Sequence, residues 1–156
     1  MSEVARRIAD GRLTSSEVTR VCLDRINTLG QAHRSVVRCD PDDALCAAER
    51  ADRELAAGHL REPIHGVPLA HKDMFYRQGQ ISACGSRILA DYRPDHTAHV
   101  LERLDAAGAL DVARLNMTEF ATGAPVFGHN PITGTPKTLG TQTLGRAVHR
   151  AAPHLR

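Results

Sequence analysis

The residue with the clearest chemical potential in this sequence is Lys72, within the stretch GVPLAHKDMF at positions 66–75. An apolar run that begins with Gly66 and Pro68 predicts a short strand, and this strand ends at the lysine. Lysine is rarely buried unless it is paired. Lys72 nevertheless has apolar residues on both sides in the sequence, so we expect at least the stem of its side chain to lie in apolar surroundings. Desolvation disfavours an ammonium ion, which is how a protein makes a lysine a base near neutral pH. The pattern therefore predicts a catalytic role for Lys72.

Other roles for Lys72 stay open at the level of the local sequence. A long cationic side chain can follow the end of a strand out to solvent, or it can pair with Asp73. A third role is that of a Schiff-base lysine in an aldolase-like enzyme. That chemistry needs a complete barrel or another closed site, which 156 residues do not supply.

The composition is that of one ordinary soluble globular domain, with 42% hydrophobic and 24% charged residues. Aromatic residues make up 3% and tryptophan is absent, so alanine, leucine, valine and isoleucine must form the core. A net charge of +2 argues against nucleic-acid contact or an anionic membrane surface. No run approaches the roughly 20 apolar residues that cross a bilayer. We therefore expect a cytoplasmic chain without membrane contact.

The cysteines and histidines show no metal-binding pattern. The four cysteines have neither zinc-like nor CxxC spacing, which favours reduced thiols. Among the nine histidines, His96 and His99 could share a helix face, but further ligands are missing. We expect no metal site.

The order of expected elements predicts an α/β fold. Thr14 and Glu17 have capping-box spacing ahead of a helix that Gly30 should end. Asp40 and Pro41 form a second helix start, and Asp95 a third. Strand, helix and strand spaced in this way indicate a layered α/β architecture. The expected helices are 2–9, 14–30, 40–58 and 95–108, and the expected strands are 35–39, 66–75 and 109–115.

A long loop follows the last expected strand. Residues 116–136 contain repeated glycine and proline, which excludes regular structure. Loops beyond strand ends are where α/β proteins place their sites. From Lys137 to Arg156 the sequence has no clear periodicity.

Four segments, in matching order and spacing, resemble the amidase signature family. They are GVPLAHKDM at 66–74, Cys84-Gly85-Ser86, Arg103-Leu104 with AAGA at 106–109, and LNMTEFA at 115–121. The resemblance covers roughly residues 1–136. It implies the N-terminal portion of the amidase signature fold, a mixed sheet flanked by helices, present here in incomplete form.

The resemblance also implies a chemistry. The family hydrolyses carboxylic amides with a serine nucleophile, a second serine held by a cis peptide, and a lysine base that falls on Lys72. A small-molecule amide is the implied substrate, and neither a metal nor an organic cofactor is needed. Asn116, Met117, Glu119 and Phe120 resemble the wall near the substrate, where we expect structural support rather than direct chemistry. Two alternatives are a component similar to the glutamine-hydrolysing subunit of a tRNA-dependent amidotransferase, and a non-catalytic interaction fragment.

The sequence departs from the family after Pro136, where a glycine- and serine-rich segment should supply both serines. Ser86 is the last serine in the chain, and Thr138, Thr141 and Thr143 lack the glycine context. Codons for residues 150–155, read two nucleotides later, permit Gly-Gly-Ser-Ser-Ser. The hypothesis is that a frameshift near Pro136 left an unrelated, disordered tail at 137–156 and an inactive chain. A sheet cut short in this way exposes an edge, so we expect self-association.

Overall fold

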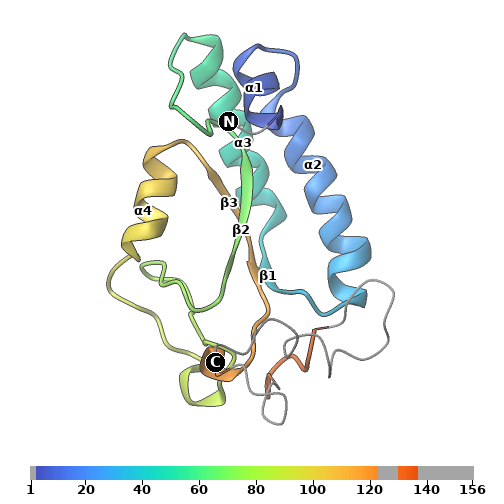
Figure 1. The fold of residues 1–156 in the computed structure, drawn as a ribbon, viewed down its shortest axis with the longest axis vertical. Helices are drawn as coiled ribbons and strands as arrows, with labels where there is room; N and C mark the ends of the chain where they lie inside the picture. Colours follow the sequence, from blue (N-terminus) through green and yellow to red (C-terminus); the bar gives the residue numbers. More distant parts are fainter. Residues whose placement is uncertain (1–2, 123–129, 137–156) are drawn as a thin grey trace, which may run out of the picture.

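The computed structural model describes residues 3–122 and 130–136, which fold into helices packed around a three-stranded mixed sheet (Figure 1). The predicted α/β class is confirmed. The helices are α1 (Glu3–Ala9), α2 (Ser15–Arg25), α3 (Pro41–Ala56) and α4 (His99–Ala106), with a π-helical turn at Ile26–Gly30 and 3-10 turns at Arg87–Leu89 and Glu119–Ala121. The strands are β1 (Val36–Cys39), β2 (Pro68–Lys72) and β3 (Leu110–Leu115).

Strand β3 lies in the middle of the sheet. It pairs in parallel with β2, with Lys72 opposite Leu115, and antiparallel with β1. Helix α4 provides the crossover between the two parallel strands, as expected for a parallel pair. In Figure 1, α4 and α2 lie on opposite sides of the strands. Because β2 and β3 are parallel, their C-terminal ends lie side by side at the same end of the sheet.

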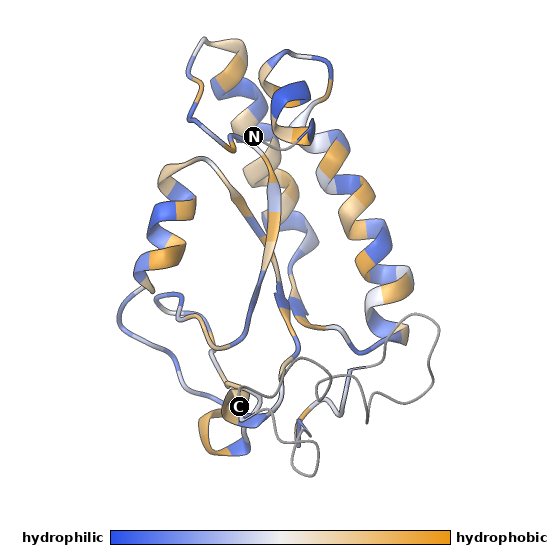
Figure 2. Cartoon of the chain, in the orientation of Figure 1, coloured by the Kyte–Doolittle hydropathy of each residue, from blue (hydrophilic) through white to orange (hydrophobic). Residues whose placement is uncertain are grey.

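Helix α3 carries an alanine stripe that packs against β3. Ala44, Ala48 and Ala51 are buried together with Leu110 and Val112. Small side chains let the helix approach the strand closely, which suits a chain with few aromatic residues. Figure 2 shows the amphipathic pattern of α2, α3 and α4 as alternating hydrophobic and hydrophilic bands.

Two predicted helix starts are confirmed in detail. Thr14 and Glu17 form the capping box, in which each side chain accepts a hydrogen bond from the other residue's backbone N–H. Asp40 caps α3 through Asp43 N, and Pro41 occupies the first turn. These caps satisfy backbone donors that have no partner inside the helix.

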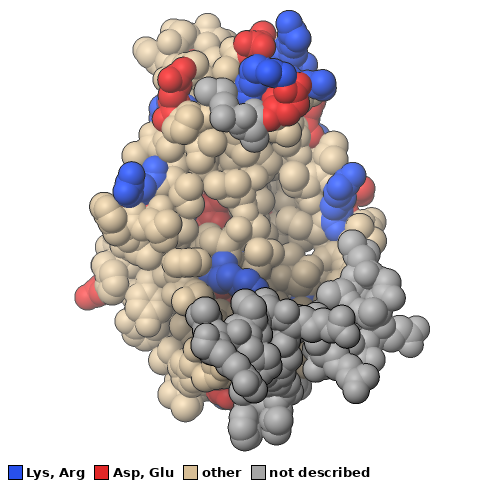
Figure 3. Space-filling view, in the orientation of Figure 1, with Lys and Arg blue, Asp and Glu red and all other residues tan. Residues whose placement is uncertain are grey.

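The start of α2 is also fixed from outside the helix. The Asp52 carboxylate of α3 accepts hydrogen bonds from Ser15 N (2.6 Å), Ser16 N (3.1 Å) and Ser16 Oγ (2.6 Å). The same contacts therefore cap α2 and join it to α3. Figure 3 shows charged side chains of both signs gathered at the end of the molecule where α1 and the start of α2 lie.

Two predicted boundaries are wrong. Gly30 does not end the second helix, because Gln31 after it keeps a helical backbone and the left-handed turn falls on Arg34 at φ +51°. A Cβ at Gly30 would lie 3.4 Å from Val36 Cγ2, an ordinary van der Waals distance, so neither a left-handed backbone nor crowding requires glycine here.

The second error concerns the start of α4. The helix begins at His99, with Ala98 as the flanking residue and no side-chain cap, rather than at Asp95. Ala98 N donates instead to Tyr76 O (2.8 Å), which holds this segment against the loop after β2. This tertiary contact keeps residues 95–98 out of the helix in which the local sequence would place them.

Candidate functional site

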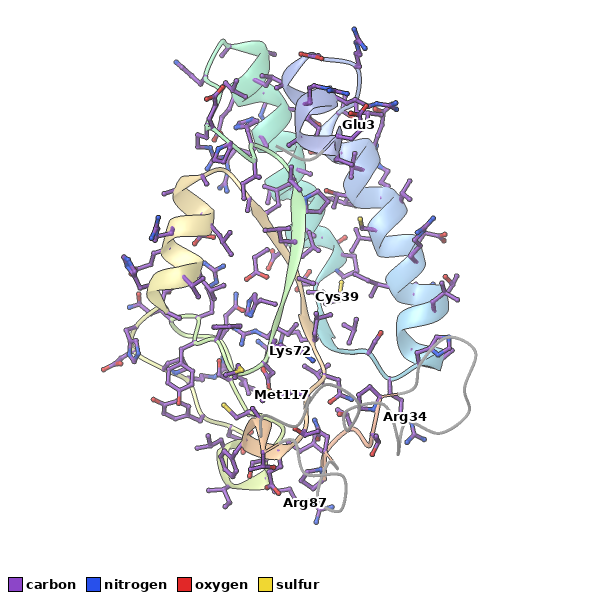
Figure 4. All side chains as sticks on the ribbon, in the orientation of Figure 1. Glu3, Arg34, Cys39, Lys72, Arg87 and Met117 are labelled. Atoms are coloured by element: carbon purple, nitrogen blue, oxygen red, sulfur yellow. The ribbon has the colours of Figure 1, made fainter. Side chains whose placement is uncertain are left out.

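Lys72 lies at the C-terminal end of β2, beside the end of β3. Its Nζ donates a hydrogen bond to the backbone oxygen of Asn116, at 3.2 Å. The contact follows from the register, because Lys72 is paired with Leu115 and Asn116 is the next residue along. Figure 4 shows Lys72 and Met117 near the same end of the strands.

Lys72 is not buried among the described residues, and the apolar surroundings expected for its stem stay a prediction. The residue is exposed in the structure, because the last residue of β2 faces outward at the end of an edge strand. Its amine is nevertheless held by a fixed backbone oxygen rather than left free in solvent. Pairing with Asp73, the other structural role considered for Lys72, is also not what the structure shows.

Asp73 points inward and pairs with Arg114 of β3. The Arg114 guanidinium lies 3.4 Å from the Asp73 carboxylate and donates to Ser82 Oγ at 2.9 Å, and both charged residues are at most 5% exposed. Burial raises the pKa of the Asp73 carboxyl and lowers the pKa of the Arg114 guanidinium, although each charge opposes the shift of the other. The pair anchors the chain directly after Lys72.

His71, on the other side of Lys72 in sequence, is engaged elsewhere. Its Nε2 lies 3.2 Å from Asp111, which also forms an ion pair with Arg77 at 3.0 Å. Successive residues of a strand face opposite sides of the sheet. His71 therefore belongs to the α4 side of the sheet and not to the surroundings of the lysine amine.

Two segments of the sequence resemblance pack against each other below the strand ends. Gly85 adopts φ +67°, and a Cβ at this position would lie 2.9 Å from Met117 O. Ser86 Oγ donates to Glu119 Oε1 at 2.6 Å, and Phe120 N donates to Cys84 O at 2.9 Å. The turn at 82–86 therefore positions the segment at 116–120.

The four residues expected near a substrate have different environments. Asn116 and Met117 are buried, and Glu119 is half-buried and bound to Ser86. Phe120 is 47% exposed and has a left-handed backbone at φ +48°. The first three are held in the scaffold and Phe120 is exposed, while their position beside a substrate stays a prediction.

Sequence reasoning missed Arg114, Ser82 and Asn130. Arg114 interrupts an apolar strand, and that interruption was a usable sign of a buried ion pair. Asn130 is 2% exposed, and its Nδ2 donates to Asn116 Oδ1 at 2.7 Å. Nothing in the local sequence distinguishes Asn130 from an ordinary loop residue.

The described residues contain no group of three or more histidine, cysteine, aspartate or glutamate side chains able to hold a metal ion. His96 lies outside α4 and interacts with Asp95. All four cysteines are free thiols. Within residues 3–122 and 130–136, every helix is too short or too polar to cross a membrane. The predicted domain boundary at 136/137 and the expected disorder of 137–156 concern residues outside the described part, and the cytoplasmic location stays a prediction.

Solved structures with this arrangement are amidase signature enzymes. The native peptide amidase from Stenotrophomonas maltophilia matches with a TM-score of 0.71 and 35% identity, over 78% of this chain and 25% of that one. A second structure, described as an amidase, gives a TM-score of 0.76 and 32% identity, over 86% of this chain and 30% of that one. The fold is thus that of part of an amidase signature enzyme.

The family follows from sequence comparison. The Amidase family model matches residues 17–138, so the chain belongs to the Amidase family. A glutamyl-tRNA(Gln) amidotransferase subunit of Azoarcus sp. (strain BH72) is 40% identical over 124 residues, covering 80% of this chain and 25% of that protein. The corresponding subunit of Chloroflexus aurantiacus (strain ATCC 29366) is 44% identical over 117 residues, covering 75% of this chain and 24% of that protein. The chain spans about a quarter of the length of these relatives.

Proposed function

We propose that this chain forms the lysine-bearing part of an amide-hydrolysing site, with Lys72 as the base. The observation that carries the proposal is the position of the Lys72 amine at the shared end of β2 and β3, held by Asn116 O at 3.2 Å. As the base, Lys72 would take a proton from a serine nucleophile through a bridging serine, and backbone N–H groups would stabilise the oxyanion.

The serines of that mechanism are not supplied by these 156 residues. The sequence after Ser86 contains no serine. Ser82 and Ser86 are themselves fully buried, and their hydroxyls are bound to Arg114 and Glu119. Loss of a nucleophile commonly costs many powers of ten in rate. We therefore propose that the 156-residue chain alone does not hydrolyse amides.

An assay of the purified chain with simple carboxylic amides tests whether the chain alone is inactive. The expected result is release of ammonia at the rate of the buffer blank, unchanged in Lys72→Ala. Hydrolysis above the blank that is lost in Lys72→Ala would contradict it.

The role of Lys72 needs a complete site. Residues 17–136 can replace the matching segment of the Chloroflexus protein, with which the identity is 44%. We expect the chimera to hydrolyse an amide, and Lys72→Ala and Lys72→Arg to abolish the activity. His59→Ala, at an exposed position outside the site, is the matched control. Activity that survives Lys72→Ala would refute the assignment of the base.

Glutamine is a second candidate amide for the same site. The specific support is the match to glutamyl-tRNA(Gln) amidotransferase subunits, at 40% and 44% identity. Because the Chloroflexus protein supplies about three quarters of the chimera, its preference is compared with that of the unsubstituted Chloroflexus protein. An unchanged preference for glutamine over a peptide amide would favour this candidate, and a shift toward the peptide amide would favour a plain amidase. A non-catalytic interaction role predicts instead that the chimera stays inactive although it folds.

A further inference from the structure

The amide side chain of Asn116 uses its whole hydrogen-bonding capacity. Its Nδ2 donates to Arg34 O (2.7 Å) and to Gly134 O (3.0 Å), and its Oδ1 accepts from Met117 N (2.7 Å) and Asn130 Nδ2 (2.7 Å). A side-chain amide has two N–H donors and an oxygen with two lone pairs. Any rotation of this buried group would break at least one of these bonds, so its orientation is fixed.

Asn130 is equally saturated and connects the loop at 130–136 to the end of β3. Its Nδ2 donates to Met117 O (3.1 Å) as well as to Asn116. Its Oδ1 accepts from Ile132 N (2.8 Å) and Thr133 N (3.0 Å), which sets the turn of the loop. The two asparagines form a fully satisfied buried network, the kind that rigidifies its surroundings.

This network determines where the carbonyl that binds Lys72 points. Asn116 C=O and Met117 N–H belong to the same peptide group, which is planar, so the direction of one fixes the direction of the other. Asn116 Oδ1 binds the Met117 N–H at 2.7 Å. The opposite side of that peptide group presents Asn116 O to Lys72 Nζ at 3.2 Å.

We propose that Asn130 is a positioning residue for the Lys72 amine. Asn130 Nδ2 donates to Asn116 Oδ1 and so fixes the Asn116 side chain. That side chain in turn keeps the peptide between Asn116 and Met117 in the orientation that presents Asn116 O to Lys72. The inference rests on the proposed function only in that it treats this amine as the base. Asn130 acts through Asn116 and touches no reacting atom.

The sequence makes a direct test practical, because Lys72 and Lys137 are its only lysines. In protein labelled with [13C,15N]lysine, each side chain gives one set of NMR signals, and Lys72→Arg and Lys137→Arg assign them. Two measurements report on the amine. The first is the separation of the two Hε resonances of Lys72, which a fixed side chain shows. The second is the ratio of Lys72 to Lys137 acetylation by a limiting dose of acetic anhydride, read by mass spectrometry.

Three variants make the test specific. Asn130→Asp keeps the acceptor for Ile132 N and Thr133 N but loses both donors, and Asn130→Ala loses all four contacts. Asp52→Asn is the matched control, because it weakens the packing of α2 on α3 without contacting the site. A merely structural role of Asn130 would lower the melting temperature, as in the control, without a specific effect on Lys72.

We expect both Asn130 variants to merge the Lys72 Hε resonances. We also expect them to raise the acetylation ratio about fivefold, the change in population that corresponds to one ordinary hydrogen bond. The control should change neither value. An unchanged ratio and unchanged resonances in folded Asn130→Asp would overturn the proposal. So would the absence of separate Hε resonances in the unsubstituted chain. Loss of the fold in Asn130→Asp would overturn it too, since the network would then be a requirement for folding. None of these readouts needs hydrolysis, so they succeed or fail independently of the proposed function.

Discussion

The Arg114 guanidinium lies 3.4 Å from the Asp73 carboxylate, and the side chains of both are at most 7% exposed. The pair joins the residue that follows Lys72 to the middle strand of the sheet. Arg114 also donates to Gln80 Oε1 at 3.1 Å and to Ser82 Oγ at 2.9 Å, so it holds the turn after β2 at two further points. A single buried cation thus organises the surroundings of the proposed base.

Arg114→Met should lower the free energy of unfolding by about 3 kcal/mol, because it leaves a buried carboxylate without its partner. Adding Asp73→Asn removes that uncompensated charge, so the double variant should lose less than the sum of the single losses. Urea titrations followed by circular dichroism measure all three values. Additivity within about 0.5 kcal/mol would show that the two side chains are not coupled.

Gly85→Ala should be more costly than an ordinary glycine substitution. The position combines φ +67° with a Cβ that would lie 2.9 Å from the backbone oxygen of Met117. We expect a loss of about 3 kcal/mol, of which the left-handed conformation accounts for roughly 1 kcal/mol and the backbone contact for the rest. Thermal or urea unfolding provides the measurement.

Gly79→Ala is the matched control for this substitution. Gly79 has φ +72°, but a Cβ there would meet nothing within 4 Å. It should therefore lose only the conformational part, about 1 kcal/mol. Equal losses at the two glycines would mean that the packing of the 82–86 turn on the 116–120 segment contributes little to stability.

The elements that local sequence signals define were predictable, and the tertiary contacts were not. The capping box at Thr14 and the Asp40-Pro41 start depend on residues three apart or adjacent, and both are confirmed. Gly30 misled because the left-handed turn falls on Arg34 instead, and Asp95 misled because a backbone bond from Ala98 to Tyr76 holds the segment ahead of α4. The local sequence distinguishes neither outcome.

The same division applies to the candidate site. The arrival of Lys72 at a strand end could be predicted, because glycine, proline and an apolar run mark that strand. Its acceptor, Asn116 O, depends on the parallel register of β2 with β3, across 44 residues of sequence. Asn130 reaches the site from a loop whose sequence indicates only turns. Side-chain amides in loops have many possible partners, and the fold selects one set.

The Asp52 carboxylate should make stability depend on pH. Burial raises its pKa, but the hydrogen bonds from Ser16 and Ser15 outweigh burial and hold the pKa below the ordinary aspartate value of 3.8. The folded state therefore favours the ionised form. Its contribution is complete above pH 3.8 and is lost as the pH falls through the lower, folded-state pKa.

Asp52→Asn should accordingly destabilise the chain at pH 6 by about 1 kcal/mol, the typical value of a helix N-terminal contact. The difference between the variant and the parent chain should shrink at pH 3. Asp91→Asn, at an exposed position outside the four α-helices, is the control and should change the free energy of unfolding little at either pH. An Asp52→Asn difference that is equal at both pH values would contradict the assigned sign.

The outer edge of β2 should allow the chain to associate with a second copy of itself. Among the described residues, β1 and β2 each have one neighbouring strand, so β2 has an outer edge with unpaired backbone groups. Such an edge is a template for pairing with another chain. We expect the sedimentation coefficient to rise with protein concentration in the micromolar range. Ala70 is exposed in β2, so Ala70→Lys should weaken the association by placing a charge along the edge, whereas Ala90→Lys, exposed but outside the sheet, should not. A chain that sediments as a monomer at all concentrations, or an association equally sensitive to both substitutions, would exclude the β2 edge as the contact.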